Sequence, residues 1–331
     1  MTNRPSVVVS GTGSYLPAGI LTNDDLSQMV ETSDEWIVTR TGIRERRIAS
    51  ADETTADMGF VASREAIAAA GLKPEDIDLL IVGTITPDML FPSTACMLQA
   101  RLGLRQIPAF DVEAACSGFL YTIDIARAML QAGTIKHALV VGAEKLSSIV
   151  DWTDRSTCVL FGDGAGAVVL SRSDEPGIGM IDSILGSDGN GGDILHMPGG
   201  GAALPATEDS VRARQHFLKM NGREVFKIAV RVMEKAILEI LEKQGLAPDD
   251  VSLFVPHQAN IRILEMLATR MKLPLDRFAL NIDRLGNTSA ASIPIVLDEA
   301  FREGRIESGD LVVLVAFGAG LTWGATLIRW Q

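Results

Sequence analysis

Cys116 stands where an expected strand joins an expected helix, a position from which a thiol can act as a nucleophile. The segment IPAFDVEAACSGFLYTIDIARAMLQAG starts apolar and continues with apolar residues at helical spacing. Small residues surround Cys116, which suits a sharp turn that presents one side chain. The helix dipole would favour a thiolate there, but a gain of up to ~2 kcal/mol lowers a thiol pKa by little more than about one unit. A nearby base would therefore be needed as well.

Two further polar residues could assist such a thiol. His257 follows an apolar strand in VSLFVPHQAN, which would place its imidazole at the end of a strand rather than on a core face. Asn287, in LGNTSAASIP, stands in another turn that leads into small residues. By residue type and pattern alone, Cys116 fits a small buried hydrophobe as well as a nucleophile, and Asn287 fits a turn former better than a catalyst.

The elements that must position these residues follow an α/β pattern. Apolar β-branched runs alternate with helical patterns in both halves of the chain, at 7–9, 79–82, 139–141, 168–170, 251–255 and 311–315. Runs that are apolar at successive positions predict strands buried on both faces. We therefore expect an α/β protein in which sheets lie between layers of helices.

An internal repeat indicates a duplicated architecture. GLKPEDIDLLI at 71–81 returns as GLAPDDVSLFV at 245–255, an offset of 174 residues. MLQARLGL (97–104) also resembles MLATRMKL (266–273), in the same order along the chain. We expect an N-terminal half at 1–178, which carries Cys116, and a C-terminal half at 216–331, which carries His257 and Asn287. The glycine-rich stretch between them, assigned to 179–215, predicts a connecting loop or lid.

The composition excludes several classes of protein. The 331 residues are 47% hydrophobic and 22% charged, which predicts a folded globular chain. A net charge of −12 argues against nucleic acid as the main partner. Three widely spaced cysteines predict no disulfide framework and suit a cytoplasmic protein. The longest apolar stretch, 311–321, is about half of the ~20 residues that a membrane span needs, so no span is expected.

Two glycine-rich motifs invite a nucleotide-binding interpretation. They are GTG at 11–13 and GDGAG at 162–166, and neither opens a helical pattern whose N–H groups could hold phosphate. We predict tight turns at both. The chain has no cysteine and histidine cluster at metal-ligand spacing, so no metal and no tightly held cofactor are expected.

The chain resembles the β-ketoacyl-acyl carrier protein synthase III family of the thiolase superfamily. The motifs that carry the resemblance span nearly the whole chain: SDEWIVTRTGIRERR (33–47), DVEAACSGFLY (111–121), LFGDGAGAVVL (160–170), NGREVFK (221–227), VPHQANIRI (255–263), GNTSAASIP (286–294) and AFGAGLTWG (316–324). The resemblance implies a five-layer αβαβα sandwich built from two duplicated halves, with Cys116, His257 and Asn287 as the catalytic triad.

The resemblance also implies an activity and its partners. An acyl group passes from coenzyme A, acting as a substrate, to the cysteine. Malonyl-acyl carrier protein then loses carbon dioxide and attacks the thioester to give a 3-oxoacyl product, which initiates fatty acid synthesis. The backbone N–H of Cys116 and one from the 317–320 turn would form the oxyanion hole.

Further residues match family positions that contact the substrates. Trp36, Arg40 and Arg155 would hold coenzyme A, Asn260 would steady its pantetheine arm, and Arg262 would bind the carrier protein. Phe91 would reach across a homodimer interface to the partner's acyl pocket. Ala319 stands where the family usually has glycine, and Leu321 replaces an aromatic residue, so acyl-chain preference does not carry over from relatives.

Three alternatives remain at this level. An enzyme on the same scaffold could use another primer or acceptor, as in quinolone or polyketide pathways. A cysteine hydrolase would release free acid without condensation. In a non-catalytic binding module, Cys116 would be unreactive.

Overall fold

Two β-sheets form the framework of the protein, described here from a computed structural model that covers residues 5–331. The first sheet has the strand order β1-β7-β6-β4-β5 and the second β11-β12-β13-β8. The bounds of the first are β1 (Ser6–Tyr15), β4 (Leu79–Gly83), β5 (Ala109–Val112), β6 (His137–Glu144) and β7 (Gly164–Ser173). Those of the second are β8 (Gly179–Ser187), β11 (Leu253–Pro256), β12 (Leu311–Gly318) and β13 (Thr322–Arg329).

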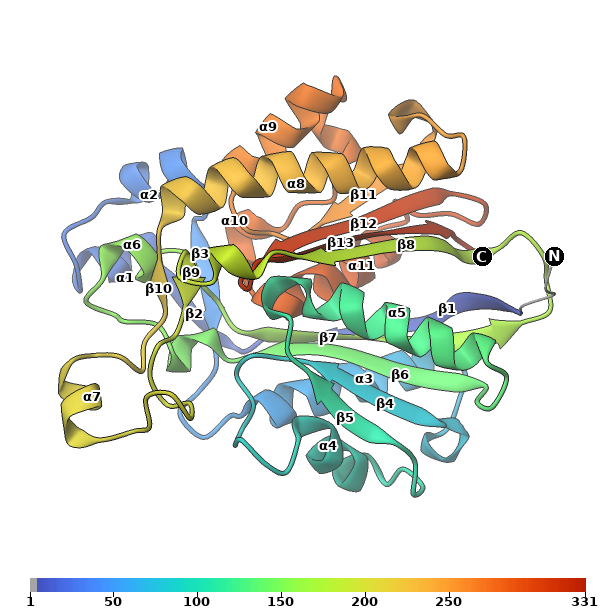
Figure 1. Ribbon diagram of the computed structural model, residues 1–331, viewed down its shortest axis with the longest axis horizontal. Helices are drawn as coiled ribbons and strands as arrows, with labels where there is room; N and C mark the ends of the chain where they lie inside the picture. The colour runs from blue at the N-terminus through green and yellow to red at the C-terminus, as the bar shows by residue number, and fades with distance from the viewer. Residues whose placement is uncertain (1–4) are drawn as a thin grey trace.

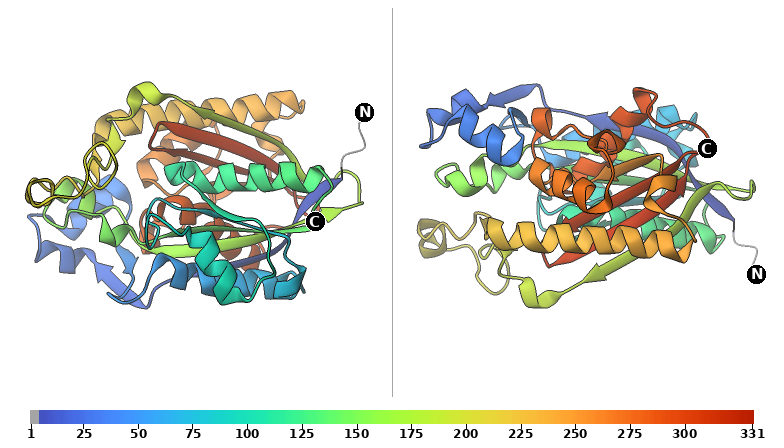
Figure 2. Two further views of the ribbon diagram at one scale, coloured as in Figure 1. Left: turned by 60° about the horizontal axis from the view of Figure 1, so that its bottom comes forward. Right: turned by 90° about the horizontal axis from the view of Figure 1, so that it is seen from above.

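Helices cover both outer faces of this pair of sheets and fill the space between them (Figure 1). The outer pairs are α3 (Thr55–Ala69) with α4 (Thr94–Leu102), and α8 (Gly222–Lys243) with α9 (Ile261–Met271). The central pair is α5 (Gly118–Gln131) with α11 (Ser292–Arg302). The view from above shows α8 and α9 lying across the second sheet (Figure 2). The expected five-layer αβαβα sandwich is therefore confirmed.

Three hydrophobic cores correspond to the contacts between these layers. The largest joins the two sheets through α5 and α11, and includes Phe119, Leu120 and Val296. A second lies between the outer helices α8 and α9 and the second sheet, and a third lies between α3 and α4 and the first sheet. Because β4, β6 and β12 are covered on both faces, nearly every residue in them is buried. This explains why their sequences are continuously apolar.

The sequence repeat folds twice into the same local structure. In both copies a helix ends, a short 3₁₀ turn follows, and a buried strand begins. The Lys73 N–H donates to the Asp76 carboxylate at 2.9 Å, and the Ala247 N–H donates to Asp250 at 2.7 Å. The strands that follow, β4 and β11, pair in parallel with β6 and β12. Each half therefore uses one conserved geometry to connect an outer helix to its sheet.

Two sequence predictions need correction. Residues 179–187, assigned to the connecting loop, form strand β8, which pairs antiparallel with β13 at the edge of the second sheet. Its mixed polar and apolar residues are only partly buried, so it lacks the continuous apolar run of the central strands. GTG at 11–13 is not a turn but lies inside β1. Glycine is needed there because a Cβ at Gly11 would lie 2.4 Å from the backbone oxygen of Ala66 in α3.

Smaller elements gather at the end of the molecule where the central helices begin (Figure 1). They are β2 (Gly19–Thr22), α1 (Asn23–Ser27), α2 (Asp34–Thr41), β3 (Glu45–Ile48), α6 (Arg155–Cys158), β9 (Leu195–His196), α7 (Glu208–Arg212), β10 (Lys219–Met220) and α10 (Ile282–Leu285). In the connecting segment, α7 projects outward, and β9 pairs with β10, which begins the C-terminal half. None of the helices within residues 5–331 is long and apolar enough to cross a membrane.

Candidate active site

Cys116 lies in a 3₁₀ turn, η2 (Ala115–Ser117), between β5 and the N-terminus of α5. The preceding residue, Ala115, has φ +45°, a left-handed conformation that costs free energy for a residue with a side chain. Gly318 at the end of β12 packs directly against this turn, and a Cβ there would lie 2.7 Å from the Cys116 nitrogen. The predicted joint is confirmed, and its sharp turn depends on a glycine from the other half of the chain.

Burial decides the ionisation of Cys116. Cys116 is 7% exposed, and desolvation raises the pKa of its thiol to about 12, although the neighbouring Ser289 hydroxyl partly offsets this rise. The neighbouring carboxylate of Glu144 raises the pKa further. The neutral thiol is therefore favoured at rest, which agrees with the expectation that the helix dipole alone does not ionise Cys116. A base must take the proton during the reaction.

His257 extends from the end of β11 and is held as a neutral imidazole. It is 1% exposed, and desolvation lowers its pKa to about 3. Its Nδ1 lies 2.6 Å from the Ser292 hydroxyl, which also accepts the Gln258 N–H at 3.3 Å. Because the Ser292 hydroxyl accepts the Gln258 N–H, we assign its own proton to Nδ1, which leaves the imidazole proton on Nε2. The ring can then donate a hydrogen bond from Nε2 without carrying charge.

Asn287 is fixed at its backbone and at its amide oxygen. Its N–H donates to the Leu160 carbonyl at 2.8 Å, and its own carbonyl accepts the Gly162 N–H at 3.0 Å. Its Oδ1 accepts the Ser289 N–H at 2.8 Å, which assigns the orientation of the amide. The Nδ2 group is thereby left as a donor. Asn287 thus presents a second neutral donor beside the imidazole.

One cavity of about 600 Å³ brings the predicted residues together. Cys116, His257 and Asn287 lie at its inner end. Its lining also includes Trp36, Arg40, Asn260 and Arg262, together with residues of α8. The arrangement offers one nucleophile, two neutral hydrogen-bond donors and a channel to the surface, which suits acyl transfer followed by stabilisation of a developing oxyanion.

Near the mouth of this cavity, two cations lie within 5 Å of an aromatic ring; Trp36 and Arg40 line the cavity, and Arg155 lies beside them. The guanidinium carbons of Arg40 and Arg155 lie 4.5 and 4.7 Å from the Trp36 ring centroid. Arg155 also donates to the Glu31 carbonyl at 2.7 Å. Both arginines are exposed, whereas Trp36 is half-buried. These three residues could bind a flat, anionic ligand.

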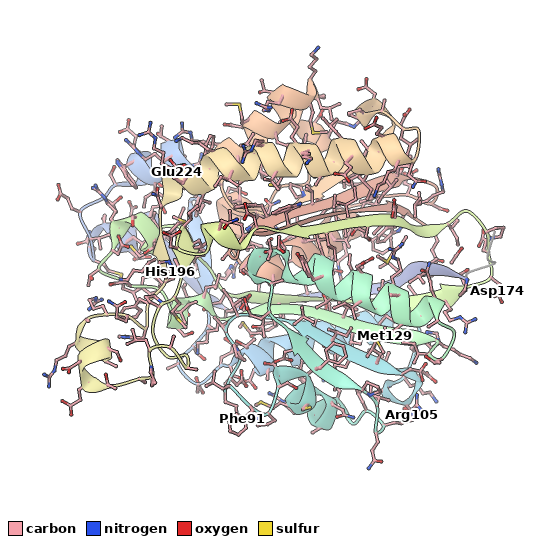
Figure 3. All side chains as sticks on the ribbon, in the orientation of Figure 1. Phe91, Arg105, Met129, Asp174, His196 and Glu224 are labelled. Carbon is pink, nitrogen blue, oxygen red and sulfur yellow. The ribbon has the colours of Figure 1, made fainter. Side chains whose placement is uncertain are left out.

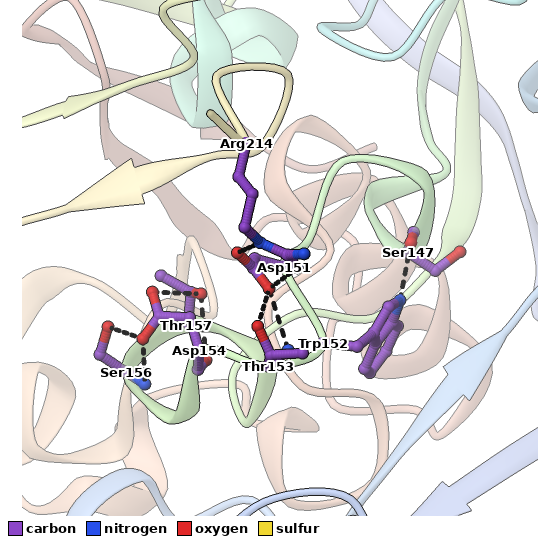
Figure 4. Close-up of polar contacts among 8 residues, drawn as sticks. All are labelled: Ser147, Asp151, Trp152, Thr153, Asp154, Ser156, Thr157 and Arg214. Carbon is purple, nitrogen blue, oxygen red and sulfur yellow. Dashed lines mark hydrogen bonds and ion pairs between the residues drawn. The ribbon is translucent and has the colours of Figure 1, made fainter. Parts of the chain in front are cut away.

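Hydrogen bonds hold the loop that carries Arg155 (Figure 4). Asp154 caps α6 by accepting the Ser156 N–H at 2.9 Å. Asp151 accepts two hydrogen bonds from Arg214, which holds the pKa of that carboxyl well below its usual range. Because Arg214 belongs to the connecting segment, this ion pair joins that segment to the loop before α6.

A second cavity, of about 410 Å³, lies on another side of Cys116. Ala319 lines it, as do Ser289 and, from the connecting segment, Leu195 and Met197. Its wall is mostly apolar, which suits an acyl chain attached to the sulfur. Phe91 lines neither cavity. It is 84% exposed and projects outward from the loop before α4 (Figure 3).

Sequence reasoning missed three residues around the triad. Ser292 orients His257, Ser289 contacts both Asn287 and Cys116, and Glu144 lies beyond Ser289. The two serines stand inside the GNTSAASIP motif, so the motif itself contained the signal. Glu144 follows an apolar strand, and a single acidic residue there gives no signal. Within residues 5–331, no three His, Cys, Asp or Glu side chains come together as a metal site.

Comparison with protein families and known proteins agrees with this geometry. Two family models match the chain: 3-oxoacyl-[acyl-carrier-protein (ACP)] synthase III at residues 110–189, and the C-terminal region of the same enzyme at 241–330. The chain is 53% identical to the beta-ketoacyl-[acyl-carrier-protein] synthase III of Caldanaerobacter subterraneus subsp. tengcongensis, over 100% of both chains.

Solved structures of similar proteins share the whole fold. The 3-oxoacyl-[acyl-carrier-protein] synthase III of Aquifex aeolicus superimposes with a TM-score of 0.91 at 50% identity, over 98% of this chain and 100% of that one. The priming beta-ketosynthase of the R1128 polyketide pathway superimposes equally well, with a TM-score of 0.91, but at 38% identity, over 99% of this chain and 97% of that one. Both the sequence and the fold therefore match synthase III proteins over nearly their full length.

Proposed function

Because the chain belongs to the 3-oxoacyl-[acyl-carrier-protein] synthase III family, we propose that Cys116 carries the acyl group in its reaction. The protein is a transferase that catalyses the condensation initiating type II fatty acid synthesis. The observation that supports our assignment of residues is the single cavity that Cys116, His257 and Asn287 share at its inner end.

In the first half-reaction, the Cys116 sulfur attacks the carbonyl carbon of an acyl-coenzyme A, with acetyl-coenzyme A or a similar short primer as the donor. The negative charge that develops on the carbonyl oxygen needs donors close to the sulfur. The N–H of Cys116 and one from the 317–320 turn are suited to this role, because Gly318 packs against the Cys116 nitrogen. Coenzyme A leaves as its thiolate, and the acyl group remains on Cys116.

In the second half-reaction, malonyl-acyl carrier protein loses carbon dioxide, and the resulting enolate attacks the Cys116 thioester. His257 and Asn287 stabilise the enolate oxygen through Nε2–H and Nδ2–H. Both donors are neutral, so neither captures the malonyl carboxylate as an ion pair. An aspartate in place of Asn287 would repel that carboxylate.

Coenzyme A binds along the larger cavity. We place its adenine between the Trp36 ring and one of the two arginines within 5 Å of that ring, Arg40 and Arg155, and a phosphate group on the other arginine. Asn260 lines the same channel further in. Its Oδ1 caps α9 by accepting the Arg262 N–H at 2.9 Å, so its amide N–H₂ is available to the pantetheine arm.

The carrier protein docks at the mouth of the same channel. Arg262 is exposed on the first turn of α9, lines the cavity and lies 5.8 Å from the Phe226 ring centroid. The cation there can attract an acidic carrier protein although the whole chain carries a net charge of −12.

The acyl site is completed in a homodimer. Leu90 and Phe91 are each 84% exposed, and Met89 is 48% exposed, which leaves an apolar tip on the surface. A second copy that covers this tip would receive Phe91 at its own acyl cavity. Size measurement of the wild type beside Phe91→Asp tests this step: a dimer that becomes a monomer supports it, and a wild-type monomer contradicts it.

Intact-mass analysis tests the proposed function directly. The protein is incubated with acetyl- and longer acyl-coenzyme A, beside Cys116→Ala, and malonyl-acyl carrier protein is then added. We expect an acyl adduct on the wild type, absent from the variant, that is discharged with release of carbon dioxide. The donor that gives the most adduct identifies the primer. Absence of an adduct with every donor would overturn the assignment of Cys116.

A further inference from the structure

Glu144 is a completely buried carboxyl group that the proposed mechanism leaves without a role. It ends β6, is 0% exposed, and accepts hydrogen bonds from Thr84, Ile85, Thr86 and Ser289. Within residues 5–331, no lysine, arginine or histidine forms an ion pair with it. Burying a carboxyl group without a cation costs free energy, so such a group is a candidate for a functional role.

The neighbours of Glu144 hold it as a proton acceptor. The N–H groups of Ile85 and Thr86 can only donate, and each lies 3.1 Å from Oε2. The Thr86 hydroxyl accepts the Lys145 N–H at 2.8 Å, so its own proton points to Oε2, 2.6 Å away. Oε1 faces the Ser289 hydroxyl at 3.1 Å. Ser289 is therefore the neighbour through which a proton can arrive from the active site.

Ser289 connects this carboxyl group to the nucleophile. Its hydroxyl donates to Glu144 Oε1 at 3.1 Å, and Ser289 and Cys116 line the same cavity from two turns in contact, η7 (Ser289–Ala291) and η2. Its backbone is held at φ +49°, and its N–H binds Asn287 Oδ1 at 2.8 Å. A left-handed backbone conformation costs free energy for serine. Here the hydrogen bonds of Ser289 hold its hydroxyl beside the Glu144 carboxyl group and near the Cys116 thiol.

We propose that Glu144 is the base that takes the Cys116 proton, through the Ser289 hydroxyl, as the thiol attacks the acyl donor. This inference rests on the proposed function, since it supplies the base that acyl transfer at Cys116 requires. Ser289 acts as a positioning and relay residue rather than as a nucleophile.

The proton transfer balances over both half-reactions. As the S–H bond breaks, its electron pair forms the S–C bond, the proton passes to Ser289 Oγ, and the Ser289 proton passes to Glu144 Oε1. Departing coenzyme A thiolate carries the negative charge out of the site. When the enolate later expels the Cys116 sulfur, the proton returns from Glu144 along the same route. Concerted transfer avoids a thiolate beside a buried carboxylate, where the two charges would repel each other.

The electrostatics of the site fit this role. Burial raises the pKa of Glu144 to about 7, which suits a base that works near neutral pH. The charge of Glu144 acts on Cys116, and the next residue in the chain, Lys145, directs its Nζ to the Ser50 carbonyl at 2.8 Å instead of to Glu144. His257 in the adjoining cavity is neutral, because burial lowers its pKa to about 3.

Other titratable groups on the elements around β6 are engaged elsewhere. The carboxylates form ion pairs: Asp57 with Arg101, Glu65 and Asp298 with Arg302, Asp124 with Arg127, and Glu299 with Arg284. Arg172 and Tyr121 donate to the backbone carbonyls of Gly133 and Gly186, and Arg64 lies over the Phe60 ring. His137 hydrogen-bonds Ser171, and Asp163 accepts the N–H groups of Ser147 and Ala49.

The test is the pH dependence of the first half-reaction. The rate of adduct formation with acetyl-coenzyme A is measured by intact mass from pH 5.5 to 9.5, beside the rate of alkylation of Cys116 by iodoacetamide. Peptide mapping separates Cys116 from the exposed Cys96. The variants are Glu144→Gln and Ser289→Ala. Asp163→Asn is the matched control, because Asp163 is equally buried but bonds Ala49 and Ser147 instead of the active site.

For the wild type and Asp163→Asn, we expect both rates to rise to a plateau above about pH 7. For Glu144→Gln and Ser289→Ala, we expect rates about 10- to 100-fold lower at pH 7, which then rise with pH and reach no plateau. A folded Glu144→Gln or Ser289→Ala protein that keeps the plateau would overturn the proposal. If Glu144→Gln does not fold, the pH profile of Ser289→Ala alone tests the relay. If the wild type forms no acyl adduct, the proposed function fails, while the alkylation profile still tests the relay.

Discussion

The two halves of the molecule use the same turn for different purposes. Cys116 stands in the 3₁₀ turn before α5, and Ala290 stands in the equivalent turn before α11, at the same offset of 174 residues as the sequence repeat. The strand that ends against each turn comes from the other half. Gly318 of β12 packs on the turn of Cys116, while Glu144 of β6 contacts the turn of Ala290 through Ser289. Gly318 and Glu144 are themselves 174 residues apart.

The comparison shows how duplication separates chemical roles. In the proposed mechanism, one half supplies the nucleophile and the carboxyl group that acts as its base, and the other half supplies two neutral hydrogen-bond donors and the space that Gly318 leaves. His257 shows the same asymmetry, because its counterpart at the end of β4 is Gly83. The shared backbone fixes the geometry, and the side chains at equivalent positions decide which half performs which step.

The largest expected effect is the loss of condensation, but not of acyl transfer, when a donor from the C-terminal half is removed. His257→Ala and Asn287→Ala should each slow condensation by about 10²- to 10³-fold, because one enolate donor is lost. Both should still form the acyl adduct, which Cys116→Ala cannot form. Intact-mass analysis before and after addition of malonyl-acyl carrier protein measures the two steps separately. Loss of the adduct in His257→Ala would instead make the imidazole necessary for deprotonating Cys116.

The next effect concerns stability and the charge at the end of β6. Burial raises the pKa of Glu144 from 4.5 to about 7, so the folded state binds more protons than the unfolded state between these values. The associated stability is present below about pH 4.5 and is lost as pH rises through 7. Relative to wild type, Glu144→Gln should therefore gain up to about 3 kcal/mol over this interval.

Urea unfolding of both proteins at pH 5 and pH 8 measures this difference. A stability difference that stays constant between the two pH values would show that Glu144 has an ordinary pKa in the folded protein. Gly318, the residue equivalent to Glu144 at the end of β12, has no ionisable side chain. It therefore contributes no such pH dependence to the stability.

A smaller effect tests the space beside the nucleophile. Gly318→Ala places a Cβ 2.7 Å from the Cys116 nitrogen, so the turn must shift. We expect acyl transfer to slow by about 10- to 100-fold, because misplacement of a reacting group by about 1 Å has effects of this size. Single-turnover rates are compared with those of Gly201→Ala, whose Cβ would meet no atom within 4 Å. Equal rates in the two variants would show that the contact does not position Cys116.

The smallest effect compares the outer helices of the two halves. Arg101 in the last turn of α4 is paired with Asp57 at 2.7 Å, whereas Arg262 on α9 has no carboxylate partner within the described chain. Arg262→Ala should raise the KM for the carrier protein about 3- to 10-fold with little change in kcat. Lys272→Ala, at the far end of α9, is the control. An equal rise of KM in both variants would indicate general attraction rather than a docking site.

Much of this architecture could be predicted from the sequence because it depends on local patterns. The continuous apolar runs of β4, β6 and β12 marked strands buried on both faces, and the repeat at 245–255 marked the duplication. Strand β8 could not be recognised, since an edge strand that is only partly buried has no such run. The glycines in β1 suggested a turn because their reason, the close approach of α3, is a tertiary contact.

The order of residues along the chain was enough to identify the candidates for reaction: a cysteine before a helix, a histidine after a strand, and an asparagine in a turn. The protonation states of the cysteine and the histidine, by contrast, depend on how the chain packs. Desolvation gives Cys116 a pKa of about 12 and His257 one of about 3, and the surroundings that cause both shifts come from residues distant in the chain. The meeting of Glu144 with Ser289, 145 positions apart, is likewise a product of packing between the two halves.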